Sequence, residues 1–334
     1  MTRLIAGGYA EAGARGLYML DAEAARLTAR GVLAPVVNVS AGLCLPGTDR
    51  WFLVDERANR IVLLDAGAGW RELASVDSGG EGPCHLAYDV CADVLACANY
   101  DSGTIAVFRL DCGFPTEPPA FYQNTGCGPN ADRQEGPHVH WVGFGAGRRL
   151  YATDLGVDRV LCFSVTREGP GAAQIAYVAP PGSGPRQIAF HPTQPVAFLV
   201  SELASTLSVL DIAADGALTA RAILSTLPAG AEGDNLAGAI ALSADAMRIY
   251  VSNRGHDSIA TFAIAPEGDA SPIGHTATGG SSPRFVLLDD DRLFVGHERT
   301  GGVTVLPLAE DGCPLAPIAR GDVPGAAFLG VLPT

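Results

Sequence analysis

The feature that most constrains the fold is a sequence unit that recurs about every 48 residues. Each copy has a short apolar strand ending in a polar residue, then a few turn residues and a second apolar strand. Clear copies are WFLVDERANRIVLLD, VLACANYDSGTIAVFRL, RLYATDLGVDRVLCFSV, VAFLVSELASTLSVLDI, RIYVSNRGHDSIATFAI and RLFVGHERTGGVTVLPL. The first strands end at Asp55, Asn99, Asp154, Glu202, Asn253 and His297; a weaker copy around Gly8 opens the chain. Seven copies predict a repeat architecture.

A further short strand precedes most copies, as in PCHLAYD, VHWVGFG, PRQIAFH and PRFVLLD. Each repeat therefore supplies a meander of antiparallel strands joined by tight turns. Four-stranded sheets of this period predict an all-β fold, a seven-bladed β-propeller that spans residues 1–334 as one domain. A pair of β-sandwiches fits less well, because the spacing stays regular throughout the chain. We expect the ring to close within one blade that pairs strands from both ends of the chain, with either the tail FLGVLP or the strand before it as the closing segment.

Composition excludes several classes of function. The net charge of −14 argues against a nucleic-acid partner, which requires a basic face. The sequence has no lysine, so all 22 basic residues are arginine and a lysine Schiff base is excluded. The lack of a long apolar stretch predicts no membrane association, and the absence of a signal peptide predicts a cytoplasmic protein. We expect a monomer or weak homodimer.

The strands nearest the axis place charged residues at equivalent positions. Aligning Tyr88, Phe144 and Phe190 and counting back four residues gives Cys84, His140 and Arg186, and the last repeat contributes Arg284. Glu202 and Arg254 lie at or just past the polar end of a later strand. Because the innermost strands of a propeller face its channel, these side chains should converge there. Charge gathered in a channel predicts a site for an anionic ligand.

The sequence resembles the seven-bladed lactonase family, which includes the propeller-type 6-phosphogluconolactonases and carboxy-cis,cis-muconate cyclase. The resemblance covers nearly the whole chain, and its most specific segments are GCGPNADRQEGPHVHWV, TDLGVDRV, GPRQIAFHP and SNRGHDSIATF. It implies lactone chemistry and a catalytic set of His140, Arg186, Glu202 and Arg254. The family often has an acidic residue and a histidine where this chain has Ala239 and Ala241. This departure weakens the assignment of 6-phosphogluconolactone more than that of lactone chemistry.

Other polar residues near these positions are candidates for substrate binding: Arg284, His85, Arg133, Glu135 and His138. His138 has the alternative of a structural role, bonding the RQEG loop. His138 and His140 are two apart, so both point to one face of a strand. No third ligand accompanies them, and we predict neither a metal nor another cofactor.

The sequence therefore predicts hydrolysis of the lactone of an anionic sugar acid. His140 or Glu202 would activate water, and one of Arg186 and Arg254 would stabilise the oxyanion. The other arginine would hold the carboxylate or phosphate of this small-molecule partner. A cycloisomerase that closes a carboxymuconate to a lactone is an alternative with similar site chemistry. A non-enzymatic propeller that binds partners on its face is a second alternative.

Overall fold

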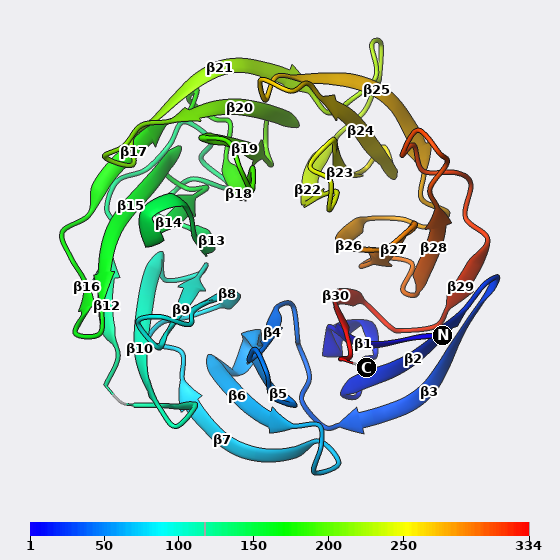
Figure 1. Cartoon of the computed structure of the whole chain (residues 1–334), viewed down its shortest axis with the longest axis horizontal. Helices are drawn as coiled ribbons and strands as arrows, with labels where there is room; N and C mark the ends of the chain where they lie inside the picture. The colour runs from blue at the N-terminus through cyan, green and yellow to red at the C-terminus, as the bar shows by residue number, and fades with distance from the viewer. Residues whose placement is uncertain (117, 334) are drawn as a thin grey trace.

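The computed structural model describes residues 1–116 and 118–333. Its strands form seven antiparallel sheets arranged as blades around a central axis (Figure 1). The predicted seven-bladed propeller is confirmed. The described residues contain no α-helix, only the 3₁₀ turns η1 (Ala10–Ala12), η2 (Glu56–Ala58) and η3 (Ala146–Arg148). None of the described segments forms a helix that is long and apolar enough to cross a membrane.

We number the blades so that the first contains β1. The innermost strands of blades 1 to 7 are β30 (Ala326–Val331), β4 (Gly42–Cys44), β8 (Pro83–Asp89), β13 (Val139–Phe144), β18 (Pro185–Phe190), β22 (Leu236–Leu242) and β26 (Pro283–Asp289). The second strands are β1 (Thr2–Gly8), β5 (Arg50–Asp55), β9 (Val94–Asn99), β14 (Arg149–Asp154), β19 (Val196–Ser201), β23 (Arg248–Arg254) and β27 (Arg292–His297). The third strands are β2 (Leu17–Glu23), β6 (Arg60–Asp65), β10 (Thr104–Asp111), β15 (Arg159–Thr166), β20 (Thr206–Ile212), β24 (Ser258–Ile264) and β28 (Val303–Pro307).

The outermost strands complete the blades. They are β3 (Arg26–Ala34), β7 (Arg71–Asp77), β21 (Leu218–Ser225), β25 (Ala270–Ala277) and β29 (Ala319–Gly321). In blades 3 and 4 the outer strand is split into two pieces, β11 (Phe114–Pro115) with β12 (Ala120–Gln123), and β16 (Gly169–Pro170) with β17 (Gln174–Val178). Both pieces pair with the same third strand, so these blades also have four layers of strands.

The core lies between the blades. In β9, Leu95 and Cys97 pack toward blade 2, whereas Val94, Ala96 and Ala98 pack toward blade 4. Successive residues of a strand point to opposite faces, so a blade that has neighbours on both sides buries both sets. This explains why the middle strands read as continuous apolar runs instead of alternating patterns.

The ring closes within blade 1, where chain segments from both ends lie side by side (Figure 1). Strand β30 pairs antiparallel with β1, with Ile5 opposite Gly330 and Ala6 opposite Leu329. The expected closure within one blade is confirmed, with the FLGVLP segment in the closing strand.

Candidate active site

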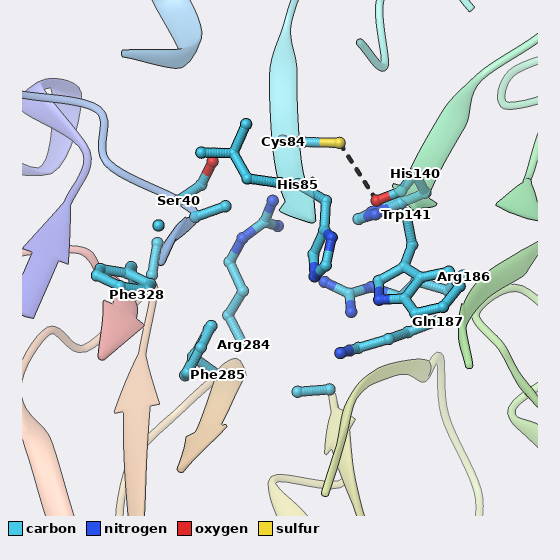
Figure 2. Close-up of a pocket in the computed structure, with 15 residues that line it drawn as sticks. Ser40, Cys84, His85, His140, Trp141, Arg186, Gln187, Arg284, Phe285 and Phe328 are labelled. Carbon is cyan, nitrogen blue, oxygen red and sulfur yellow. Dashed lines mark hydrogen bonds between the residues drawn. The ribbon is translucent and has the colours of Figure 1, made fainter. Parts of the chain in front are cut away.

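The first set of site residues lies where the pairing between the first and second strands of a blade is interrupted. In blades 3, 4, 5 and 7 the register between the first and second strands shifts by one residue, which leaves Cys84, His140, Arg186 and Arg284 without an opposite partner. Such β-bulges redirect a side chain and recur beside active sites. The alignment that placed these four residues at one level is confirmed. All four line the central channel (Figure 2).

A second set of residues lies at or just beyond the end of the second strand of each blade, and here one sequence assignment is wrong. The strand pairings show that Ser201, not Glu202, is equivalent to Asn99, because Ser201 pairs with Pro185 and Thr206 as Asn99 pairs with Pro83 and Thr104. The apolar pattern of blade 5 hid this one-residue offset. Glu202 belongs to a separate set one position later, and its members are Tyr9, Glu56, Tyr100, Leu155, Glu202, Arg254 and Glu298.

Glu202 is the centre of the site. Its side chain is 2% exposed, and three guanidinium groups surround its carboxylate. Arg133 Nη2 lies 2.7 Å from Oε1, while Arg186 Nε and Arg254 Nη2 lie 3.0 and 2.6 Å from Oε2. Sequence analysis proposed Arg133 as a substrate-binding residue but did not predict its direct contact with Glu202. Three arginines around one carboxylate leave an excess of positive charge.

The electrostatics follow from this geometry. Burial alone would raise the pKa of Glu202, but Arg254, Arg186 and Arg133 together hold it well below its usual range. Glu202 is therefore ionised and a weak proton acceptor. Burial lowers the pKa of Arg186 to about 10, with a further contribution from Arg254, so Arg186 remains charged at neutral pH.

His140 lies at the edge of this cluster. Its Nε2 is 3.8 Å from Glu202 Oε2, which is too long for a hydrogen bond but close enough for the carboxylate to stabilise an imidazolium. Burial, with a smaller contribution from Arg186, lowers the pKa of His140 well below its ordinary value. The imidazole is therefore neutral at neutral pH and able to accept a proton.

His138 precedes β13 and is held by its loop. Its Nδ1 lies 3.0 Å from the carbonyl oxygen of Tyr100, and its Nε2 lies 3.1 Å from Glu135 Oε1. The ring of Tyr100 stacks on His138 and meets His140 edge-on, at centroid distances of 4.5 and 5.3 Å. Glu135 is 61% exposed and bonds His138 instead of joining the Glu202 cluster.

The two longest sequence motifs interlock behind the site. Asp154 accepts hydrogen bonds from the backbone N–H groups of His138 and Gly156, at 2.8 and 3.0 Å. Asp158 accepts one of 2.9 Å from Gln134 Nε2. A Cβ on Gly156 would lie 1.9 Å from the carbonyl oxygen of Gly136, so the two loops approach more closely than a side chain there would permit. These motif residues therefore position the loop that carries Arg133 and leads into β13, the strand of His140.

Two hollows lie on either side of the Glu202 cluster. A channel cavity of about 100 Å³ is lined by His140, Arg186, Arg284 and His85 among others. A groove of about 470 Å³ is lined by Arg254, together with Tyr9 and Glu298. Because Arg186 faces the cavity and Arg254 faces the groove, and both contact Glu202, the cluster separates the two hollows.

Ala239 and Ala241, where this chain departs from the family pattern, both pack in the apolar cluster between blades 6 and 7, but of the two only Ala239 also lines the channel cavity. Ala239 lines the channel cavity, so its small side chain leaves space there. Ala241 packs against the apolar cluster between blades 6 and 7. If the larger residue that other family members have at this position contacts the substrate, Ala239 cannot make that contact.

Sequence analysis missed several polar residues of the site: Ser40, Tyr100, Gln187 and Glu298. Tyr100 and Glu298 were detectable, since each follows the polar residue that ends a second strand. Ser40 was not, because it precedes a strand of only three residues. In the part of the chain that the structure describes, no three His, Cys, Asp or Glu side chains are grouped to hold a metal ion.

Comparison with known proteins agrees with the fold and the motifs. The chain is 32% identical over 311 residues to the uncharacterized protein YwcC of Lactococcus lactis, covering 91% of each chain. It is 32% identical over 232 residues to the 6-phosphogluconolactonase of Bacillus subtilis, covering 68% of this chain and 66% of that protein. A crystal structure of a Lactobacillus plantarum protein superposes with a TM-score of 0.90 at 29% identity and covers 99% of both chains. The sequence model of the family described as "Lactonase, 7-bladed beta-propeller" matches residues 3–328, and the chain belongs to that family.

Proposed function

We propose that this protein hydrolyses the lactone of an anionic sugar acid, with 6-phosphogluconolactone as the first substrate to test. The observation that carries the proposal is the grouping of a neutral histidine with a carboxylate that three arginines surround. The likeness to the Bacillus subtilis 6-phosphogluconolactonase supports the choice of substrate.

His140 is the general base in this mechanism. Its Nε2 takes a proton from water as the water oxygen attacks the lactone carbonyl, and Glu202 stabilises the resulting imidazolium from 3.8 Å. The imidazolium then returns the proton to the ring oxygen as the carbon–oxygen bond breaks, and the product is the open hydroxy acid. Glu202 serves poorly as the base, because its pKa is held well below the usual range.

Arg186 stabilises the tetrahedral oxyanion. Its Nε contacts Glu202, and its Nη1 donates a 2.9 Å hydrogen bond to the carbonyl oxygen of Gly238. These two bonds fix the guanidinium plane before substrate arrives, which lowers the reorganisation that charge stabilisation would otherwise require.

A bound anion also makes His140 a stronger base. Arg186 and Arg284 contribute to lowering the pKa of His140, after the larger effect of burial. A phosphate or carboxylate beside these arginines offsets their charge and raises that pKa toward neutrality. Anionic lactones should therefore exceed neutral lactones in kcat as well as in affinity.

A pH-stat assay tests the proposed function. 6-Phosphogluconolactone, neutral glucono-1,5-lactone and 3-carboxymuconate are offered to wild-type protein and to His140→Ala, and uncatalysed hydrolysis is subtracted. We expect hydrolysis of the anionic lactone by wild type and its loss in His140→Ala. Turnover of 3-carboxymuconate with no lactone hydrolysis would instead identify a cycloisomerase, and no turnover of any of the three would refute an enzymatic function of this class.

A further inference from the structure

The channel cavity has an unusual lining for a protein of net charge −14. Among its described lining residues, the charged side chains are Arg186 and Arg284, and none is Asp or Glu. The acidic neighbours of these arginines lie elsewhere: Glu298 lines the groove, and Glu202 stands between the two hollows. The cavity is therefore a small space with cationic walls.

Two buried polar atoms without hydrogen-bond partners also indicate that this cavity binds a ligand. Ser40 is 8% exposed and lines this cavity, and its Oγ has no hydrogen-bond partner among the described residues. His85 Nδ1 is likewise shielded from solvent and unpartnered in the described structure. Buried polar atoms are normally satisfied, so an orphaned pair beside one cavity indicates an absent hydrogen-bond partner.

Arg284 is the residue best placed to meet that acceptor. Figure 2 shows its side chain extending into the channel toward His85 and Ser40. Its nearest carboxylate oxygen, Glu298 Oε1, is 3.6 Å away, and its guanidinium lies 5.3 Å from the centre of the Tyr9 ring. The guanidinium is thus held in position while it makes no hydrogen bond to the described residues.

Size decides which part of a ligand fits here. A water molecule needs roughly 10–15 Å³ of such space, so about 100 Å³ holds several waters or one small polyatomic anion. It is too small for a sugar lactone, since ligand pockets usually measure about 300–1,000 Å³.

We propose that the channel cavity is an anion subsite in which Arg284, with Ser40 and His85 beside it, binds the phosphate or carboxylate of the substrate. Arg284 is then the specificity-determining residue, a role separate from that of the Glu202 cluster. The assignment of the anion to the substrate rests on the proposed function; the binding of an anion by the cavity does not.

Calorimetric titration with inorganic phosphate tests the subsite in the full chain without any turnover. Parallel titrations with sulfate and acetate show whether the cavity prefers a phosphate-like anion or a carboxylate. Arg284→Gln and Ser40→Ala are compared with Arg71→Gln, which removes an arginine charge from the exposed outer strand β7. We expect wild type and Arg71→Gln to bind alike and Arg284→Gln to bind about tenfold to a hundredfold more weakly, as for lost hydrogen bonds to charged groups. Ser40→Ala, which keeps both arginines, should weaken binding by a smaller factor and covers the case that Arg284→Gln does not fold.

The outcomes separate this inference from the proposed function. If no anion binds to wild type, or if Arg284→Gln and Ser40→Ala both bind as wild type does, the subsite is refuted. Binding through Arg284 with no lactone turnover keeps the subsite and refutes the hydrolase. If the lactonase is active, Arg284→Gln should raise KM for 6-phosphogluconolactone and leave KM for glucono-1,5-lactone unchanged; an unchanged KM for both would refute Arg284 as the specificity residue.

Discussion

Replacing Glu202 with glutamine should destabilise the protein more than any other single loss of charge in the site. The substitution keeps the shape of the side chain but removes the negative charge between Arg186 and Arg254, whose side chains are 8% and 9% exposed. Removing one partner from a buried ion pair typically costs about 3–5 kcal/mol, because the other charge stays buried without compensation. We expect a loss of this size in the free energy of unfolding.

The corresponding thermal shift follows from the length of the chain. An unfolding entropy of about 2.1 cal/mol/K per residue gives roughly 0.7 kcal/mol/K for 334 residues. A loss of about 3–5 kcal/mol therefore lowers Tm by roughly 4–7 °C. Arg133→Gln is the matched control in the same cluster. The Arg133 side chain is 35% exposed, so solvent screens its ion pair and the variant should lose about 1 kcal/mol or less of the free energy of unfolding.

Equilibrium denaturation in urea provides the assay, with Glu202→Gln, Arg254→Gln and the double variant forming a mutant cycle. Since the two residues are in direct contact at 2.6 Å, the double variant should lose less than the sum of the single losses, by about 0.5–3 kcal/mol. A Glu202→Gln variant within 1 kcal/mol of wild type, or additive losses, would show that the cluster is not a coupled ion network and that the stated pKa directions are wrong.

Four further outcomes are expected. His140→Ala should lower kcat on the best lactone by roughly 10²–10⁴, whereas His138→Ala should act on stability by about 1 kcal/mol or slightly more; the reverse pattern in kinetics of folded variants would contradict the assigned base. Burial lowers the pKa of His85 to about 3 and that of His140 well below 6.5. The unfolded chain therefore binds more protons than the folded chain below pH 6.5, and urea denaturation should show full stability above that pH and a progressive loss as pH falls toward 3. Asp154→Ala removes the acceptor of three hydrogen bonds from a fully buried position and should cost about 2–4 kcal/mol; a loss below 1 kcal/mol would mean that the interlocked loops do not depend on it. Activity should survive exhaustive chelation, and loss with EDTA that calcium or zinc restores would reveal a metal site.

The fold was predictable because its signal repeats. Each blade buries both faces, so its middle strands are apolar throughout, and seven copies of one pattern reinforce each other even where a single copy such as that around Gly8 is weak. The same repeated pattern led to the wrong assignment of Glu202 as the residue that ends its strand. The residue that ends the strand and the residue that follows it are both polar in several blades, and only strand pairing separates them.

The site was predictable only in part, for a geometric reason. Positions on the innermost strands could be found by counting, because the bulge occurs at the same point in four blades. Contacts between residues of different blades could not, since Arg133 and Glu202 are 69 residues apart and Arg133 comes from a loop outside the repeat. Ser40 precedes a short strand, and no periodic pattern indicates that its hydroxyl faces a cavity.

The closure of the ring in blade 1 affects how the chain folds during synthesis. Strand β1 is synthesised first and pairs with β30, which also supplies Ala327 and Phe328 to the wall of the channel cavity. At about 5–20 residues per second, the ribosome needs roughly 15–65 s between these two strands. Throughout that interval one edge of β1 has no partner, and an unpaired edge is a template for pairing with other chains. The wall of the anion subsite is therefore complete only after β30 pairs with β1. Phosphate binding should thus measure ring closure during refolding as directly as any spectroscopic probe of the strands.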